Sequence, residues 1–135
     1  MEKENYYQDV TIIIVLFKED FELIYKTLNK LRSFKIIIVD NANNQSLKKK
    51  IQSNFTIKEY ILNKKNLGFS AGYNQAAKLC KTKYLLILGP DCQISDIDIF
   101  KLIKNLSSDS NCFLVSPTAY DNNNSSMTYV GGPLP

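Results

Sequence analysis

Short apolar runs alternate along the chain with segments whose apolar residues recur every three or four positions. Val10 to Phe17, Lys35 to Val39 and Tyr84 to Leu88 are apolar at nearly every position, as expected of strands that are covered on both faces of a parallel sheet. Thr56 to Leu62 and Cys112 to Ser116 are predicted as two further strands. Strands of this kind are typical of a sheet packed between helices.

Helices are predicted between these strands, because the apolar residues there have helical spacing. The first follows Asp20, a residue type that caps helix amino termini, and the last follows the capping sequence Ser95-x-x-Asp98. A short helix over Ser46 to Ser53 and a longer one over Ser70 to Lys81 are predicted between them. Strands that alternate with helices predict an α/β fold with a mostly parallel sheet and helices on both faces.

The length of 135 residues corresponds to one domain. We expect that domain to span residues 1–135, with a polar tail over residues 1–9 and one more short strand over Met127 to Val130. The longest apolar run, Ile12 to Phe17, is too short to cross a bilayer. Met1 to Gln8 lacks the apolar core of a signal peptide.

The composition narrows the chemistry that the domain can perform. The chain has no histidine. It therefore cannot form a Ser-His-Asp or Cys-His catalytic site, or a zinc site with histidine ligands. The formal net charge is +4, from 17 basic and 13 acidic residues, which is too weak and scattered to predict a nucleic-acid partner. The three cysteines form no Cys-x-x-Cys pair, which indicates reduced thiols and a cytoplasmic location.

Polar residues gather where the predicted strands end. Four such groups follow four strands: Lys18 to Asp20, Asp40-Asn41, Asn63 to Asn66, and Asp91. The carboxyl ends of parallel strands meet at one edge of a sheet, and open α/β sheets bind their ligands in a crevice there. The sequence therefore predicts one ligand site built from four separate loops.

Each of these loops also has a plain structural interpretation. Asp40 could accept hydrogen bonds from a ribose or a base, or it could cap a turn. The glycines of Asn66 to Asn74 allow a phosphate to approach the backbone, or a helix to pack closely on the sheet. Asp91 could bind Mg²⁺ or Mn²⁺ bridging to a diphosphate, or begin the next helix. Phe17 could stack on a base or close the core.

The order and spacing of four segments resemble one enzyme family. The segments are Val10 to Phe17, Ile37 to Ala42, Asn66 to Asn74 and Tyr84 to Asp91. Together they are similar to the nucleotide-sugar-binding half of family 2 glycosyltransferases with the GT-A fold, and among these to rhamnosyltransferase-like enzymes of surface polysaccharide synthesis. The resemblance covers Val10 to Cys92 well and Cys112 to Gly132 more loosely. It implies a Rossmann-like three-layer domain, truncated relative to a complete enzyme.

The resemblance also implies a donor site for a UDP- or dTDP-sugar. Its residues would be Phe17, Glu19, Asp40, Asn41, Asn66, Gly68, Asn74 and Asp91. Phe17 would line the base pocket, and Asp40 would bind the base or ribose. Asn66 and Gly68 would border the diphosphate, and Asp91 would hold Mg²⁺ or Mn²⁺. The acceptor would be a saccharide or a lipid-linked acceptor. The expected location of the protein is therefore the cytoplasm or the inner face of the membrane.

The chain departs from the family pattern in three respects. Leu16 and Lys18 stand where the family has Thr or Ser and then Asn. Gly89 replaces the first acid or Asn of the metal motif, so we expect weak metal binding. The family's catalytic base belongs to the acceptor-binding half, which we expect this chain to lack. We therefore assign no catalytic residue, and we expect negligible transfer by the chain alone and an uncovered apolar surface that favours self-association.

One other function class remains open, and two others lack the motifs that they require. A non-catalytic relic or interaction module with the same fold is the alternative to a glycosyltransferase-like domain. A dinucleotide-binding oxidoreductase would need Gly-x-Gly-x-x-Gly after the first strand, where the chain has Leu16 to Asp20 instead. A P-loop NTPase would need Gly-x-x-x-x-Gly-Lys-Ser/Thr, which the sequence does not contain.

Overall fold

A computed structural model describes residues 6–120, 123, 126 and 127 of the chain. Contacts between residues divide it into two compact units, residues 1–98 and 99–135. The first unit contains a four-stranded sheet and the helices that cover it. The second unit takes up most of the last helix and a short pair of strands.

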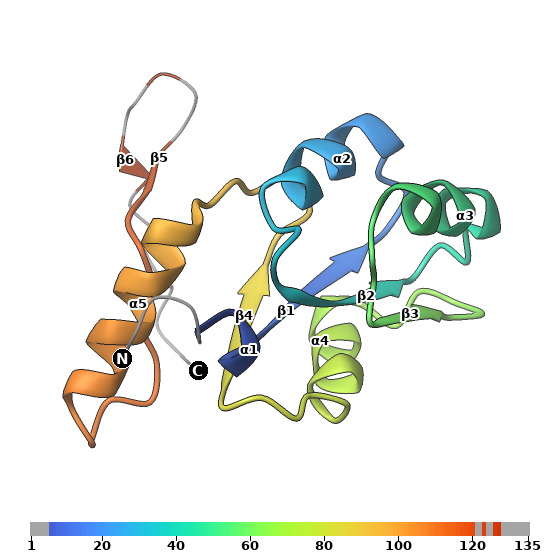
Figure 1. The fold of residues 1–135 in the computed structure, drawn as a ribbon. Coiled ribbons are helices and arrows are strands. Elements are labelled where there is room, and N and C mark those ends of the chain that lie inside the picture. Colours follow the sequence, from blue (N-terminus) through green and yellow to red (C-terminus); the bar gives the residue numbers. More distant parts are fainter. Residues whose placement is uncertain (1–5, 121–122, 124–125, 128–135) are drawn as a thin grey trace. The chain divides into compact units, whose positions relative to one another are not determined.

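Four parallel strands form the sheet of the first unit, in the order β3-β2-β1-β4. They are β1 (Val10–Leu16), β2 (Lys35–Asp40), β3 (Glu59–Leu62) and β4 (Tyr84–Leu88). Every residue of β1 is buried, and so is every residue of β2 after the first, because the central strands of a parallel sheet are covered on both faces. The predicted α/β fold with a parallel sheet is confirmed (Figure 1).

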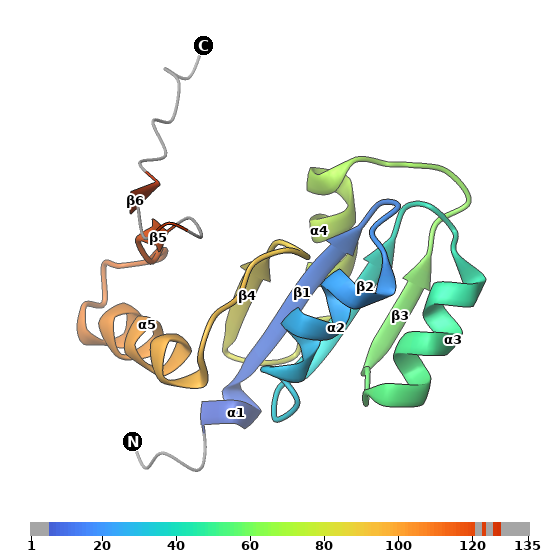
Figure 2. The ribbon, with the colours of Figure 1, turned by 90° about the horizontal axis from the view of Figure 1, so that it is seen from above.

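Helices lie on both faces of this sheet, but β4 is not covered on both faces as predicted, because Leu85 and Ile87 are 41% and 57% exposed. Figure 1 shows α2 (Phe21–Asn29) and α3 (Gln45–Asn54) on one side and α4 (Phe69–Ala77) on the other. Alternate residues of β1 and β2, among them Ile13 and Val39, form a buried cluster with Ala76 of α4. Seen from above, in Figure 2, α2 lies over β1 and β2. The sheet therefore forms the middle of three layers.

Asp20 caps α2 as predicted, and Asn44, which was not predicted as a cap, does the same for α3. Asp20 Oδ1 accepts the backbone N–H of Leu23 at 2.9 Å, and Asn44 Oδ1 accepts that of Leu47 at 3.0 Å. Helix α3 is longer than predicted, because Leu47 and Ile51 are four residues apart and both are buried. None of the helices that the structure describes has the length and apolarity needed to cross a membrane.

The start of the chain differs from the expected polar tail. Tyr6–Asp9 form the short helix α1, and Tyr6 is buried. The ring centroids of Tyr6 and Tyr7 are 4.2 Å apart, and that of Phe34 lies 4.9 Å from the Tyr7 ring. The Tyr7 hydroxyl donates to Asp96 Oδ2 at 2.9 Å. Aromatic packing therefore orders residues 6–9 immediately before β1.

In the second unit, one of the predicted strands is not present. Helix α5 (Asp96–Ser108) is followed by the antiparallel pair β5 (Ala119–Tyr120) and β6 (Ser126–Met127). No strand forms over Cys112 to Ser116, where Phe113 and Leu114 are 88% and 85% exposed. An apolar pattern does not suffice there, because a strand also needs a hydrogen-bonded neighbour. The strand expected over Met127 to Val130 is present at Met127, and residues 128–130 lie outside the described residues.

Candidate functional site

The carboxyl ends of the strands lie next to one another, as predicted. Leu16 pairs with Asp40, and Asp40 pairs with Leu62. Two backbone hydrogen bonds of 2.9 Å continue this order past the strands, from Asn41 N–H to the Leu16 carbonyl and from Asn63 N–H to the Asp40 carbonyl. The loops that follow β1, β2 and β3 therefore begin side by side at one edge of the sheet, which we call the carboxyl edge.

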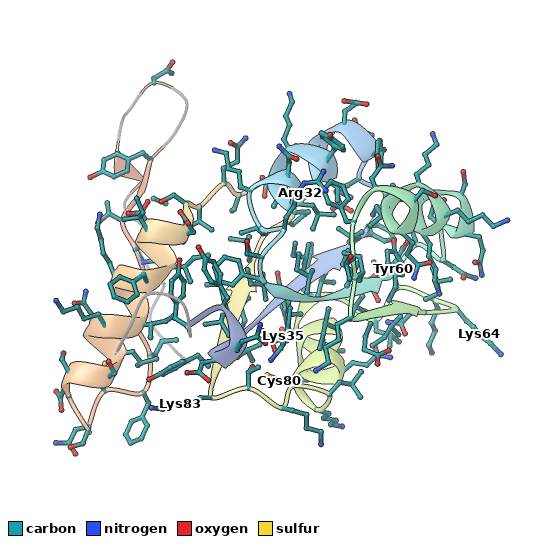
Figure 3. All side chains as sticks on the ribbon, viewed as in Figure 1. Arg32, Lys35, Tyr60, Lys64, Cys80 and Lys83 are labelled. Carbon is teal, nitrogen blue, oxygen red and sulfur yellow. The ribbon has the colours of Figure 1, made fainter. Side chains whose placement is uncertain are left out.

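Asp40 is buried at the end of β2, on the face of the sheet that carries α3. Its Oδ1 accepts the backbone N–H of Ala42 at 2.8 Å, and its Oδ2 accepts the N–H of Asn44 and the Tyr60 hydroxyl, both at 3.2 Å. Burial, followed by the nearby Asp40 carboxylate, raises the pKa of Tyr60, so this hydroxyl remains a donor at neutral pH. Tyr60, labelled in Figure 3, gives no signal in the sequence beyond that of a packing aromatic residue.

Asn41 and Asn63 form a buried amide network with Gln75 of α4. Asn63 Nδ2 donates to Asn41 Oδ1 and to Gln75 Oε1, both at 2.9 Å, and Gln75 Nε2 donates back to Asn63 Oδ1 at 3.1 Å. Asn41 Nδ2 donates to the Gly68 carbonyl at 3.1 Å. The sequence places Asn63 at the crevice but does not identify Gln75, because the two residues belong to different elements.

The predicted loop Asn66 to Asn74 reaches the same edge only in its first part. Gly68 has a φ of +79°, which favours glycine, and its N–H donates to Asn66 Oδ1 at 2.8 Å. A Cβ at Gly72 would lie 2.9 Å from Val15 Cγ1, so glycine lets α4 pack closely on β1. Asn74 lies farther along α4, where its side chain is exposed.

The loop after β1 has an unusual backbone at Lys18. This residue has a φ of +69°, and its Nζ lies 5.1 Å from the centroid of the Phe17 ring. The Glu19 carboxylate accepts the backbone N–H of Phe17. The Phe17 ring is 37% exposed and is therefore accessible to a stacking partner.

The loop after β4 holds Asp91 exposed near Tyr73. The Tyr73 hydroxyl donates to the Leu88 carbonyl at 3.2 Å. Burial raises the pKa of Tyr73, and so do the nearby charges of Cys92, Asp91 and Glu19. Thr27 of α2 donates to the Pro90 carbonyl at 2.8 Å and holds this loop from the other side.

Asp91 is the residue of this edge that the sequence predicts as a metal ligand. Within the described part of the chain, no three acidic or cysteine side chains form a group that could hold a metal ion. A Cβ at Gly89 would lie 3.0 Å from Asp91 Oδ1 and from Cys92 Sγ, so a larger residue there would require one of them to shift. Asp91 fits a metal that takes its other ligands from a diphosphate and water.

A cavity of about 370 Å³ lies away from this edge, beside the ends of α2 and α3. Its charged residue, Arg32, donates to the Asn54 carbonyl at 3.0 Å, and its guanidinium carbon lies 4.4 Å from the Phe55 ring centroid (Figure 3). Arg32 therefore supports the end of α3, where helix carbonyls lack helical partners. This structural role accounts for the arrangement.

Solved structures support the fold described above. TarS 1–349 of S. aureus has a TM-score of 0.57 and 20% sequence identity over 73% of this chain and 33% of its own. A second structure of S. aureus TarS has a TM-score of 0.58 and 20% identity over 84% of this chain and 24% of its own. The chain thus spans about a third or less of the length of these structures, and the likeness concerns the fold.

The sequence itself identifies the family. No curated protein matches it. The family model for Glycosyl transferase family 2 matches residues 11–132, which include all four strands and all four loops of the carboxyl edge. The chain belongs to glycosyl transferase family 2.

Proposed function

We propose that the carboxyl edge binds a nucleoside-diphosphate sugar, a UDP- or dTDP-sugar, as donor for transfer to an acceptor hydroxyl. The observation that carries this proposal is the side-by-side start of the loops after β1, β2 and β3 in a member of family 2. Open parallel sheets bind nucleotides at this edge.

The base and ribose of the donor would meet the loops after β1 and β2. The exposed Phe17 ring offers a face for stacking on a base. Asp40 is buried and already accepts three hydrogen bonds, so we propose that it shapes the backbone of residues 42–44 around the ribose or base. Glu19, which accepts the Phe17 N–H, would hold the turn that presents the ring.

The diphosphate would meet the loops after β3 and β4. Asn66 and Gly68 would border it, and Asn74 would face the sugar end of the donor from α4. Family 2 glycosyltransferases generally use a divalent metal ion. We propose that Asp91 holds Mg²⁺ or Mn²⁺ there, weakly, because position 89 is glycine. When bound, such an ion stabilises the charge of the departing diphosphate.

The acceptor would be a saccharide or lipid-linked saccharide, and the reaction would take place in the cytoplasm or at the inner face of the membrane. Deprotonation of the acceptor hydroxyl needs a general base, and we assign none among residues 6–120. We therefore propose that this chain binds the donor and that transfer depends on a further segment.

Donor binding is tested by thermal unfolding with UDP, dTDP, GDP or NADH, each with and without Mn²⁺. A ligand at 100 times its dissociation constant stabilises the folded state by about 2.7 kcal/mol, a shift of several degrees for a domain of this size. We expect a Mn²⁺-dependent shift with UDP or dTDP, which Asp91→Asn removes. The matched control is Glu59→Gln, which removes an exposed carboxylate at the opposite edge and should keep the shift.

The alternative function is a non-catalytic interaction module, favoured by the glycine at position 89. It predicts cooperative unfolding with no nucleotide-dependent shift, with or without Mn²⁺. That outcome would overturn the donor-binding proposal. A shift with NADH alone would point to a dinucleotide ligand and overturn it as well.

A further inference from the structure

The side chains of Asn41, Asn63 and Gln75 pair with one another and with the Gly68 carbonyl. Asn41 is 3% exposed and Asn63 is 8% exposed. No buried side-chain nitrogen or oxygen among the described residues lacks a hydrogen-bond partner. Burying amides is costly unless every group is paired, so a fully paired network specifies one arrangement of its members. Asn41 and Asn63 therefore fix the structure of the loops, because their polar groups are buried and paired within the protein.

What the network fixes is the loop between β3 and α4. Asn63 lies at the start of this loop and Gly68 at its end. Asn63 is held by Asn41 and Gln75, and the Gly68 carbonyl accepts both Asn41 Nδ2 and the Gly72 N–H, each at 3.1 Å. Both ends of the loop are thus attached to the same group of three amides.

The residues between these two ends have few contacts of their own. Lys64, Lys65, Asn66 and Leu67 are all exposed. Within the loop, the Asn66 side chain accepts a hydrogen bond at its Oδ1 from the backbone N–H of Gly68. The position of Asn66 therefore depends on the position of Gly68, and Gly68 depends on Asn41.

We propose that Asn41, Asn63 and Gln75 are positioning residues of the donor site, which hold Asn66 and Gly68 where the diphosphate binds. This inference rests on the proposed donor-binding function. It changes the role of Asn41 from a contact with the nucleotide to a contact with the loop that borders it. It also assigns a role to Asn63, which the sequence places at the crevice, and to Gln75, which the sequence pattern does not identify.

The test uses Gln75→Met and Asn63→Ala, with Ile51→Val as the matched control. Gln75→Met removes both hydrogen bonds to Asn63 from the flank of α4 and keeps the length of the side chain, so this variant is expected to fold. Asn63→Ala removes all three amide bonds. Ile51→Val lowers stability from the core of α3 without touching the network.

Two quantities are measured at a temperature where every variant is folded: the dissociation constant of the UDP–Mn²⁺ complex, by calorimetry, and hydrogen exchange of residues 64–72. We expect Gln75→Met to weaken binding about tenfold, the effect of losing about one net hydrogen bond, and to speed exchange in this segment. Gln75→Glu keeps the bond from Asn63 Nδ2 and should weaken binding less. The double variant with Asn63→Ala should be no worse than Asn63→Ala alone, because both act through one network. Ile51→Val should change neither quantity.

Unchanged UDP affinity in Gln75→Met and Asn63→Ala, with wild-type binding intact, would overturn the positioning role and leave donor binding standing. Loss of affinity equal to that of Ile51→Val would also overturn it, since the effect would then follow stability alone. Absence of UDP and dTDP binding in the wild-type chain would overturn the proposed function and the positioning role together.

Discussion

The two edges of the sheet differ in what their polar side chains contact. At the amino edge, Lys35, Lys58 and Lys83 stand at or just before the starts of β2, β3 and β4, and Figure 3 labels Lys35 and Lys83. Lys58 and Lys83 are exposed, and Lys35 Nζ donates to the Gln8 carbonyl at 2.7 Å. The buried polar group there is the small hydroxyl of Thr11.

The carboxyl edge buries larger and more polar side chains. Asp40, Asn41 and Asn63 are all buried, and their hydrogen bonds connect loops that are far apart in the sequence. Charged groups at the amino edge can be solvated at little cost, whereas buried amides and a buried carboxylate must be paired. The comparison teaches that polarity alone does not distinguish the two ends of the sheet, and that burial of polar groups marks the edge where loops are held in fixed positions.

The largest expected effect is that of Asp40→Ala, which removes the carboxylate at the centre of the carboxyl edge. Two backbone N–H groups and the Tyr60 hydroxyl lose their acceptor. We expect the free energy of unfolding, measured in urea, to fall by about 3 kcal/mol. The paired variant Lys35→Ala at the amino edge should cost at most about 1 kcal/mol. Equal losses in the two variants would remove the contrast between the edges.

Gly72→Ala tests the close approach of α4 to β1 near the carboxyl edge. Alanine favours a helix over glycine by about 1 kcal/mol, but its Cβ would lie 2.9 Å from Val15 Cγ1. We expect a net loss of about 1–2 kcal/mol in urea unfolding, because overpacking outweighs propensity. In a chain that already carries Val15→Ala, adding Gly72→Ala should leave the free energy of unfolding unchanged or raise it. Stabilisation by Gly72→Ala alone would show that α4 can move away from the sheet.

Tyr60→Phe tests the hydrogen bond between Tyr60 and Asp40 at the carboxyl edge through the pH dependence of stability. At pH 7 the variant should lose about 1 kcal/mol with the hydrogen bond to Asp40. The pKa of Tyr60 is raised in the folded state above its ordinary value of 10.0. Its contribution is therefore fully present below pH 10 and is lost as the pH rises further, since the unfolded state loses the proton first. We expect the difference in unfolding free energy between wild type and variant to be constant below pH 10, the ordinary pKa of tyrosine, and to shrink above it. A difference that stays constant above this pH as well would contradict this assignment.

The smallest effects are expected at the exposed lysines of the amino edge. Lys83 Nζ lies 5.1 Å from the Tyr84 ring centroid, an exposed contact of about 0.5 kcal/mol. Lys83→Gln and Lys58→Gln should each change the unfolding free energy by no more than about 0.5 kcal/mol. Neither should alter the affinity for UDP. A loss above about 1 kcal/mol in either variant would show that the amino edge also depends on specific polar contacts.

The bounds of strands with a continuous apolar pattern were predictable from the sequence, even for β4, which is only partly buried. β4 has the predicted bounds Tyr84–Leu88, and β1 ends one residue before the predicted Phe17. A short helix was expected over Ser46 to Ser53, yet α3 extends over ten residues, with two buried residues one helical turn apart. The prediction of loops that meet at one edge is confirmed for the loops after β1, β2 and β3, since parallel strands place their carboxyl ends together.

Contacts between elements could not be predicted in the same way. Tyr60 meets Asp40 because β3 pairs with β2 in one particular register. Gln75 meets Asn63 because α4 returns over the same edge. Neither pairing leaves a periodic pattern in the sequence. The strand predicted over Cys112 to Ser116 was wrong for the related reason that its apolar pattern does not reveal whether a partner strand is present.

The position of β1 at the centre of the sheet has a consequence for synthesis of the chain. β1 pairs with β4, and Val10 is opposite Tyr84, 74 positions later in the sequence. Translation at roughly 5–20 residues per second would leave about 4–15 s between the appearance of these two strands. During that interval a strand that is fully buried in the folded domain lacks one of its two neighbours. Such exposed strand edges promote aggregation, so β1 is the segment of the nascent chain that chaperones are expected to protect.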